Sequence, residues 1–509
     1  MTVGAPGSDA FLGAVRSALG DAALHVDADT LARYGTSRLP GGPRTPLAVV
    51  CPASTDDVVA LVGLARAHRI GLWPVSAGEN IALGERAPMQ AGQVVVDMGR
   101  RMDRVLEIDE TLGFVEIEPG VTFQALYDEL RRRGSELMIS TTSGPPTGSL
   151  LGNALDKGAG HTPSFDQFGS LCGMEIVLGT GEVIRTGDGS YPGAATWHLS
   201  RYGYGPVIDG LFAQSNLGIV TRAGLWLQKR PPVIRSFFFA FPDDDDIGEI
   251  FERVRPLRQS GQIAMPVKVT SDLYVAGTEE TYPFDAMGGH TPISDAARRT
   301  IQQKHGIGAW MVGAAIYGAT EADVNARIDR IRAHMEAGGK ARYIPHEEAV
   351  ERPMLKAQVD FFSGVPTSHE LGLLKWRARE GGKGGGATWY LTTCPMRGAD
   401  ALAMQARSRS ILAEHGLEYL AAFGCGPRGA RALHLIIFDR TDPEECARVA
   451  ACYRALSEAH GAVGLPVSRT ALDFQQEEMD RRDVVPSVLR RLKAVLDPDG
   501  IIAPGRYGV

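Results

Sequence analysis

The sequence Pro74-Val75-Ser76-Ala77-Gly78-Glu79-Asn80 is a turn of small and polar residues that begins at the end of a short apolar segment, 71–75. We expect that segment to be a β-strand, and a turn of this composition exposes consecutive backbone N–H groups, which can bind an anion such as a pyrophosphate. An ordinary loop is the alternative. A carboxylate about 4 Å from a phosphate would cost roughly 4 kcal/mol at an effective dielectric near 20, so we expect Glu79 to point away from the anion.

Alternating strands and helices are predicted on both sides of this turn. Residues 46–50 form an apolar strand, Ser54 caps the helix that follows, and that helix ends near His68. With the strand at 71–75 these elements make a βαβ unit. The sequence further predicts a strand at 94–97, a half-exposed hairpin of 106–108 with 115–117, a helix at 123–133 closed by Gly134, and a hairpin of 173–178 with 181–185.

A second domain is predicted after Pro231-Pro232. Strands such as 309–316, 390–393 and 433–438 alternate there with amphipathic helices, which is typical of an antiparallel sheet packed with helices. The acidic run 243–246 is interpreted as a solvated helix start, favoured by the helix dipole, with a metal site as the less favoured alternative. The glycine-rich run 381–386 predicts a mobile loop.

Composition restricts the class of protein. The chain has 509 residues, 44% hydrophobic and 22% charged, which is typical of an enzyme with two or more domains. Its net charge of −7 argues against nucleic-acid binding, because phosphate contacts require a basic face. The sequence shows no membrane-spanning apolar run and no signal peptide, so we expect a cytoplasmic protein. Its six cysteines have neither CxxC nor zinc spacing, so we expect reduced thiols and no metal.

Gly424-Cys425-Gly426-Pro427-Arg428-Gly429 matches the GxGxxG pattern of dinucleotide-binding proteins. That fingerprint needs a helix after it, whereas residues 433–438 are predicted to form a strand. We therefore interpret the match as fortuitous. The hypothesis that the protein is an NAD(P) dehydrogenase has no other support in the sequence. No HExxH, GxSxG or Walker A pattern is present to support another common chemistry.

Further small-residue segments lie downstream of the turn, at 148–153, 158–163 and 215–221. Small residues let the backbone approach a flat ligand closely, and Asn and Ser offer amide and hydroxyl partners. These segments favour a ligand-binding role for the turn over an ordinary loop.

From about residue 45 to its end, the chain resembles the flavoproteins of the vanillyl-alcohol oxidase and p-cresol methylhydroxylase type. Besides the turn at 74–80, the resemblance rests on motifs that are specific in combination. They are Val95-Val96-Asp97-Met98-Gly99, Met102-Asp103-Arg104-Val105-Leu106-Glu107, Glu118-Pro119-Gly120-Val121-Thr122, Leu151-Gly152-Asn153-Ala154, Gly173-Met174-Glu175, Tyr202-Gly203-Tyr204-Gly205-Pro206, Asp209-Gly210-Leu211-Phe212, Gln214-Ser215-Asn216-Leu217-Gly218-Ile219-Val220-Thr221 and Asp497-Pro498-Asp499-Gly500-Ile501-Ile502-Ala503-Pro504-Gly505.

The resemblance implies an α+β protein with FAD as its cofactor. A two-subdomain FAD-binding domain would span 1–230 with a C-terminal return at 495–509, and a cap domain of antiparallel sheet covered by helices would span 231–494. The turn at 74–80 would wrap the pyrophosphate. Residues implied to lie at other parts of the cofactor, or in the layer around it, are Ser149, Gly152, Asn153, Gly158, Asp166, Ile219 and Arg506.

The substrate pocket departs from the family pattern. Family members oxidise para-substituted phenols, using two tyrosines and an arginine to hold the phenolate and an aspartate beside the reacting carbon. Arg469 matches the arginine, but Ser468 and Leu83 match the tyrosines and Gly144 matches the aspartate. A phenolate would lose hydrogen bonds worth about 1.5–3 kcal/mol each, so we expect a substrate other than a simple 4-alkylphenol.

The residue that tethers FAD covalently in many members is also replaced. Its match is Thr388, within a residue or two because of the glycine-rich run, and the family's paired histidines are matched by Arg431 and Ala432. We therefore expect FAD to be bound non-covalently.

Four catalytic candidates follow from the resemblance. Arg469 would face an anionic or carbonyl oxygen of the substrate, or alternatively support the pyrimidine ring of the flavin. Without the aspartate, a proton acceptor must come from elsewhere. Glu370, which matches a family acid lining the cavity, is the first candidate, and His434 and His161 follow.

The sequence thus predicts an FAD-dependent oxidoreductase, either an oxidase or a dehydrogenase. It would take a hydride from a carbon activated by a hydroxyl, an amine or an aromatic ring of a small molecule. Oxygen or an electron carrier would be the acceptor, and the resemblance implies a homodimer. The alternative is a flavin-binding fold that catalyses a non-redox step, such as isomerisation or ring closure, or only binds a ligand.

Overall fold

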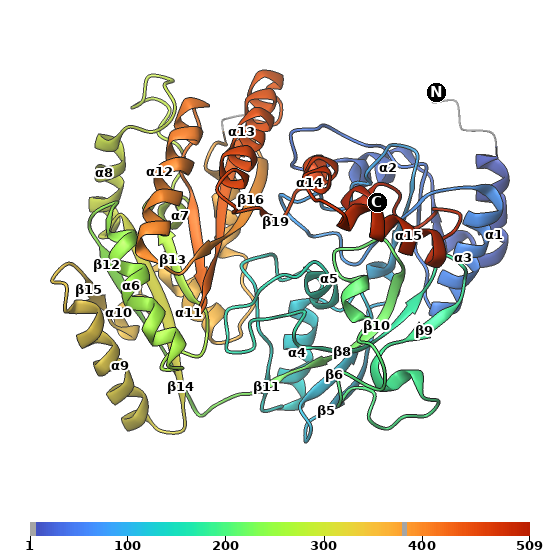
Figure 1. Ribbon diagram of the computed structural model, residues 1–509, viewed down its shortest axis with the longest axis horizontal. Helices are drawn as coiled ribbons and strands as arrows, with labels where there is room; N and C mark the ends of the chain where they lie inside the picture. The colour runs from blue at the N-terminus through green and yellow to red at the C-terminus, as the bar shows by residue number, and fades with distance from the viewer. Residues whose placement is uncertain (1–6, 379–383) are drawn as a thin grey trace.

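Two larger sheets of the described residues build most of the half of the molecule on the right of Figure 1. The computed structural model describes residues 7–378 and 384–509. The first sheet has the order β1-β2-β4-β3, in which β2, β4 and β3 are parallel. The second, antiparallel sheet has the order β5-β6-β10-β8-β9. A small antiparallel sheet pairs β7 (Leu137–Met138) with β11 (Gln228–Lys229). The strands are β1 (Leu24–His25), β2 (Ala48–Val50), β3 (Leu72–Val75), β4 (Val94–Asp97), β5 (Val105–Asp109), β6 (Phe114–Ile117), β8 (Leu171–Val177), β9 (Val183–Arg185) and β10 (Ile219–Trp226).

The two helices predicted in this half begin and end where the sequence predicts. Ser54 Oγ accepts a hydrogen bond from the Asp57 N–H at 3.1 Å, which caps α3 (Thr55–His68). Gly134, at φ 67°, ends α4 (Phe123–Arg133). The predicted βαβ unit and both predicted hairpins are confirmed. The other helices here are α1 (Ser8–Leu19), α2 (Ala28–Gly35) and α5 (Leu150–Leu155).

The first hairpin is less exposed than its alternating sequence predicts. Every residue of β6 is buried, including Glu116. Arg222 on the neighbouring strand β10 donates to Glu116 Oε1 at 3.0 Å and to Glu175 Oε2 at 2.8 Å. These ion pairs compensate the buried carboxylates, so period-two alternation does not report solvent exposure on this strand.

The described residues 233–469 form an antiparallel sheet with the order β15-β12-β14-β13-β17-β18-β16-β19, seen on the left of Figure 1. Helix α12 contacts α6 and α13, and the three helices contact strands β16, β17 and β18 of the sheet. The predicted α+β class, with two subdomains and a cap of antiparallel sheet and helices, is therefore confirmed. The cap elements are β12 (Val233–Phe241), α6 (Asp246–Gln259), β13 (Val267–Ser271), α7 (Asp272–Ala276), α8 (Asp295–His305), β14 (Trp310–Gly318), α9 (Glu321–Glu336), β15 (Arg342–Ile344), α10 (His346–Val350), α11 (Pro353–Phe362), β16 (Gly386–Pro395), α12 (Gly398–Glu414), β17 (Ala421–Cys425), β18 (Gly429–Phe438), α13 (Pro443–Gly461) and β19 (Val467–Arg469).

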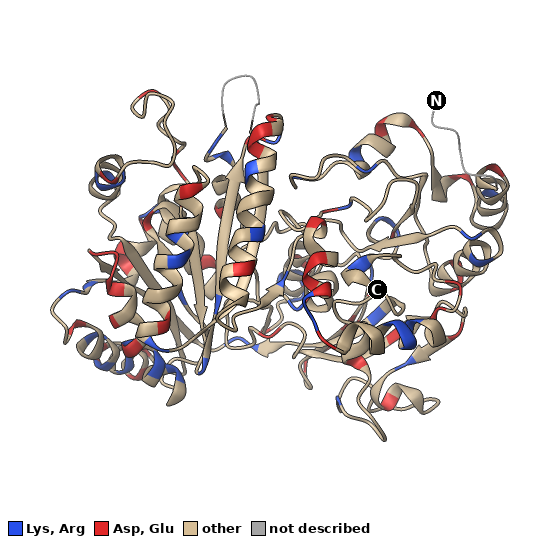
Figure 2. Ribbon diagram, turned by 45° about the horizontal axis from the view of Figure 1, so that its top comes forward, with Lys and Arg blue, Asp and Glu red and all other residues tan. Residues whose placement is uncertain are grey.

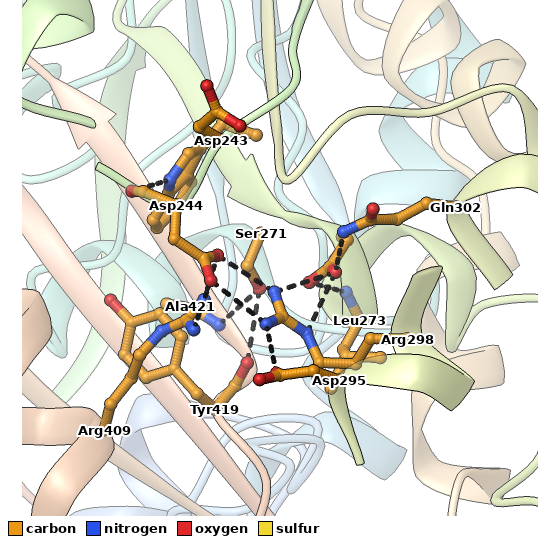
Figure 3. A network of polar contacts seen from close by, with 12 residues as sticks. Asp243, Asp244, Ser271, Leu273, Asp295, Arg298, Gln302, Arg409, Tyr419 and Ala421 are labelled. Carbon is orange, nitrogen blue, oxygen red and sulfur yellow. Dashed lines mark hydrogen bonds and ion pairs between the residues drawn. The ribbon is translucent and has the colours of Figure 1, made fainter. Parts of the chain in front are cut away.

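The acidic run lies at the start of α6, as predicted, but it is not simply solvated. Figure 3 shows two arginines converging on Asp244. Arg298 of α8 donates to Asp244 Oδ1 at 3.0 Å, and Arg409 of α12 donates to its Oδ2 at 2.8 Å. The run therefore joins three helices of the cap through ion pairs.

The GxGxxG match falls on a tight β-hairpin. It spans the end of β17, the turn and the first residue of β18, and the Gly426 N–H donates to the Gly429 carbonyl at 3.0 Å. Because a strand follows instead of a helix, its interpretation as fortuitous is confirmed.

The C-terminal segment returns to the N-terminal half, where the red end of the chain lies among the early elements in Figure 1. Leu472 N–H donates to the Leu83 carbonyl at 3.0 Å. Leu72 pairs with the last residues through Ile501 O and Ala503 N, both at 2.7 Å. Contacts with the N-terminal half thus begin before residue 495, while the domain limits 1–230 and 231–494 stay a prediction. Helices α14 (Gln475–Asp480) and α15 (Val485–Leu496) belong to this segment.

Charged residues of both signs are interspersed over both halves (Figure 2). All six cysteines are free, and five of them are buried. In the described ranges, none of the helices combines the length and the apolar character needed to cross a membrane. Residues 381–383 of the predicted mobile loop lie outside the described residues.

Candidate active site

A cavity of about 720 Å³ is lined by residues from both halves of the molecule. Most of the predicted cofactor residues lie in its wall. Those that line it are Pro74, Val75, Ser76, Gly78, Glu79, Asn80, Ser149, Gly152, Asn153, Ile219 and Arg506. The positions that match the family's phenolate-binding residues and aspartate (Leu83, Ser468, Arg469 and Gly144) also line it.

The turn at 74–80 is packed closely against two other segments of the N-terminal half. A Cβ on Gly99 would lie 2.3 Å from the Ser76 carbonyl oxygen, and one on Gly152 would lie 2.1 Å from Ser76 Oγ. Gly78 has a φ of 66°, which glycine adopts without strain. The glycines of the motifs 95–99 and 151–154 are therefore needed for the shape of the turn.

Glu79 lines the cavity, and its charge is matched by an arginine that sequence reasoning missed. Arg86 Nη2 donates to Glu79 Oε1 at 2.6 Å and to the Ala77 carbonyl at 3.1 Å. The Glu79 carboxylate is therefore turned toward Arg86. The positive charge of Arg86 offsets the repulsion that Glu79 would otherwise exert on a phosphate bound at the turn. The available signal was a basic residue a few positions after the turn.

Two of the predicted cofactor residues carry buried donors that lack a partner among the described residues. They are Asn153 Nδ2 and Arg506 Nε, and the Arg506 guanidinium lies 5.1 Å from the Trp73 ring centroid. Buried polar atoms without a partner are rare in proteins and indicate a missing ligand or water. Donors of this kind beside the turn fit a cofactor rich in phosphate and carbonyl oxygens, and FAD is such a cofactor.

Three predicted cofactor residues do not line the cavity. Ala77 is part of the turn itself. Gly158 leaves space for the side chain of Asn153, because a Cβ added at Gly158 would lie 2.0 Å from Asn153 Oδ1. Asp166 is exposed and accepts a hydrogen bond from the Gly169 N–H at 2.9 Å, which stabilises a local turn.

Arg469 is held at the cavity by Asp156, which the sequence reasoning also missed. Its Nε donates to Asp156 Oδ2 at 2.7 Å, and its Nη2 donates to Asn80 Oδ1 at 3.0 Å. The Tyr507 hydroxyl donates to Asp156 Oδ1 at 2.5 Å. Burial alone would raise the pKa of Asp156, but Arg469 and Tyr507 hold it below its usual value.

Glu370 belongs to a second polar cluster on the cavity wall. Its Oε1 forms an ion pair with Lys268 Nζ, and its Oε2 accepts a hydrogen bond from the Tyr274 hydroxyl at 3.2 Å. Lys268 Nζ also donates to Ser143 Oγ at 3.3 Å, and Ser143 Oγ lies 2.8 Å from His161 Nε2. The structure thus brings two candidate bases, Glu370 and His161, into one network beside Gly144.

Charge within this cluster is fixed by burial and by Lys268. Burial raises the pKa of Glu370, but the Lys268 ammonium outweighs that effect and holds it below its usual range. Burial, assisted by the charge of Lys268, lowers the pKa of His161 to about 3. At neutral pH Glu370 is therefore an ionised carboxylate and His161 is a neutral imidazole.

His434 and Thr388 do not line the cavity. On β18 the cavity is lined by Leu433 and Leu435, so by strand alternation His434 faces the opposite side of the sheet. Thr388 is fully buried, whereas its neighbour Trp389 lines the cavity.

Comparison with known proteins agrees with this geometry. A family model described as FAD binding domain matches residues 46–187, and one described as FAD linked oxidases, C-terminal domain, matches residues 230–507. The flavoprotein subunit of 4-cresol dehydrogenase (hydroxylating) from Pseudomonas putida is 35% identical over 97% of this chain and 94% of its own length. 1'-Carboxy-chondrochloren decarboxylase from Chondromyces crocatus is 31% identical over 97% of this chain and 96% of its own length.

The solved structure of p-cresol methylhydroxylase with substrate bound has a TM-score of 0.95 with this chain. The two are 33% identical, and the match covers 99% of this chain and 98% of that one. The predicted cofactor, FAD, is confirmed by these relatives and by the FAD-binding family match. The chain belongs to the FAD-linked oxidases of the p-cresol methylhydroxylase type and is an FAD-dependent oxidoreductase.

Proposed function

We propose that the protein removes a hydride from a substrate carbon activated by a hydroxyl, an amine or an aromatic ring, in a pocket that has diverged from the phenol-oxidising members. When bound, FAD supplies the redox chemistry by accepting the hydride. The turn at 74–80, Asn153 and Arg506 would hold this cofactor. The observation that carries the proposal is the buried Glu370 carboxylate on the cavity wall, paired with Lys268.

In this proposal Glu370 accepts the substrate proton that the family's aspartate would take. Its partner Lys268 also binds Ser143, the neighbour of Gly144, the residue that stands where that aspartate is expected. An ionised carboxylate beside a reacting carbon can act as a general base. The neutral His161 is the second base candidate in the same network.

Arg469 would bind an anionic or carbonyl oxygen of the substrate. Its Nε and Nη2 are occupied by Asp156 and Asn80, and no described residue accepts a hydrogen bond from its Nη1. Nη1 is therefore the donor that remains for a ligand, either the substrate or the flavin pyrimidine. Because Leu83 and Ser468 offer no phenolic donor, we expect weak binding of simple 4-alkylphenols.

The same proposal includes non-covalent FAD. Of the residues within two positions of Thr388, Trp389 lines the cavity, and its side chain has no nucleophilic atom. Oxygen or an electron carrier as acceptor and a homodimeric assembly remain part of the proposal.

Anaerobic mixing of the purified holoenzyme with candidate alcohols, amines and alkylated aromatics tests the function. We expect loss of the visible flavin absorption with the substrate, and a rate about 10²- to 10⁴-fold lower in Glu370→Gln. Glu280→Gln is the matched control, because Glu280 pairs with Lys304 and does not line the cavity. Full-rate bleaching in Glu370→Gln would show that Glu370 is not the base.

A second candidate function is a decarboxylation without net oxidation. One relative is named a decarboxylase, and the Lys268 ammonium on the cavity wall can attract a carboxylate. Release of CO₂ from a carboxylated substrate, with a proton replacing the lost group and no bleaching, would favour this candidate over the first.

A further inference from the structure

A lysine is buried in an inner strand of the cap sheet. Lys268 lies on β13, between β14 and β17, and its side chain is 5% exposed. It lines the cavity, and strand alternation turns its neighbours Val267 and Val269 to the other face. A buried ion pair stabilises a fold no better than apolar side chains of similar size, so stability alone does not explain Lys268.

Lys268 contacts every other polar group of its cluster except His161. Nζ binds Glu370 and Ser143, and it lies 5.7 Å from the Tyr274 ring centroid and 5.4 Å from that of Phe361. Burial lowers the pKa of Lys268, whereas the Glu370 carboxylate acts in the opposite direction and favours the ammonium. Aromatic faces also stabilise an ammonium ion, so Glu370 and these rings together favour the charged form of Lys268.

The groups that face Glu370 come from several elements. Lys268 belongs to β13, Tyr274 to α7, and Ser143 and His161 to the segments that follow β7 (Leu137–Met138) and α5. Tyr274 is a neutral hydrogen-bond donor and His161 is neutral, so among these groups Lys268 supplies the positive charge.

We infer that Lys268 is a positioning residue of the reaction, which keeps Glu370 ionised and aligned at the cavity wall. The inference rests on the proposed role of Glu370 and deepens it. Without Lys268, burial would favour the neutral carboxylic acid, and an acid cannot accept a proton from a substrate.

Infrared titration of the FAD-loaded enzyme tests the inference without a substrate. We expect Lys268→Met to show, at neutral pH, the carbonyl band of a protonated carboxyl group that wild type and Lys268→Arg lack. The band should vanish in the double variant Lys268→Met/Glu370→Gln. A Lys268→Met holoenzyme with no such band would overturn the inference.

Kinetics separate this inference from the proposed function. With the substrate found by anaerobic bleaching, Lys268→Met should reduce flavin about tenfold or more slowly at pH 7, and the rate should recover as the pH rises. Suppose that Glu370→Gln slows bleaching but Lys268→Met leaves the pH profile unchanged. That result would reject the role of Lys268 and leave the proposed role of Glu370 intact. Full activity in Glu370→Gln would reject the proposed base instead.

A folding defect would also be informative. If Lys268→Met does not retain FAD, the variant Lys268→Met/Glu370→Leu removes the uncompensated carboxylate as well. Restored FAD content would support Lys268 as the counter-ion of Glu370, and no restoration would contradict it.

Discussion

At the scale of single residues, Asp156 positions Arg469. The carboxylate of Asp156 accepts hydrogen bonds from Arg469, Asn80 and Tyr507, and its side chain is 9% exposed. Arg469 was predicted from the family pattern, whereas Asp156 stands in no catalytic motif. A half-buried arginine is stabilised by a counter-charge, and only the folded chain reveals which carboxylate supplies it.

Replacing Asp156 by Asn therefore tests the importance of this pair. The substitution keeps the shape of the side chain but leaves Arg469 without its carboxylate, and we expect a loss of about 3 kcal/mol in the free energy of unfolding. Urea unfolding of the holoenzyme measures this loss. Asp166→Asn is the control, because the exposed Asp166 should change stability by no more than about 0.5 kcal/mol. Equal effects of the two substitutions would contradict the role of Asp156.

At the scale of elements, the strand–turn–helix units were well predicted. Apolar periodicity gave α3 and α4, and the Ser54 and Gly134 caps gave their ends. The alternating pattern predicted the hairpin β5–β6 but not the burial of β6. Glu116 of β6 is buried with its charge paired to Arg222, which lies on a strand more than 100 residues away in the sequence. Local sequence determines backbone conformation, whereas the exposure of a strand depends on what packs on it.

The turn at 74–80 depends in the same way on a glycine from another element. Gly99→Ala would place a Cβ against the Ser76 carbonyl oxygen, a backbone atom that cannot move without shifting the turn. We expect Gly99→Ala to lose FAD on gel filtration, with an affinity at least about tenfold lower. Gly63→Ala on α3 is the control, since no atom lies within 4 Å of its Cβ, and it should retain FAD. FAD retention in Gly99→Ala would show that the turn does not require its observed shape.

At the scale of the whole molecule, buried histidines link stability to pH. Burial, with His460 nearby, lowers the pKa of His434 to about 3, and burial with Arg407 nearby lowers that of His460 to about 4. In the unfolded chain these imidazoles titrate near about 6.5. Below that pH the unfolded state binds protons that the folded state excludes, so stability should fall as the pH drops.

The expected slope is up to about 1.4 kcal/mol per pH unit for each such histidine between about pH 6 and about pH 4. The His434 side chain is already surrounded by the rings of Tyr390, Tyr419 and Phe423. His434→Phe should therefore lower the slope by the contribution of one histidine, up to about 1.4 kcal/mol per pH unit. Denaturant unfolding at several pH values measures this slope. His290→Gln, on an exposed loop, serves as the control and should leave it unchanged. An unaltered slope in His434→Phe would contradict a neutral buried imidazole.

The sequence by itself determined the order of strands and helices and the small-residue turn, because these follow from local patterns. It also indicated the family, through motifs that resemble those of its members, and the FAD cofactor that this resemblance implies. Only the tertiary structure decided which charges meet. Lys268 and Glu370 are 102 residues apart, and Asp156 and Arg469 are 313 apart. It also decided that His434 faces away from the cavity that Leu433 and Leu435 line. Charges and cavities are properties of packed surfaces, and burial strengthens each interaction in a way that no single segment encodes.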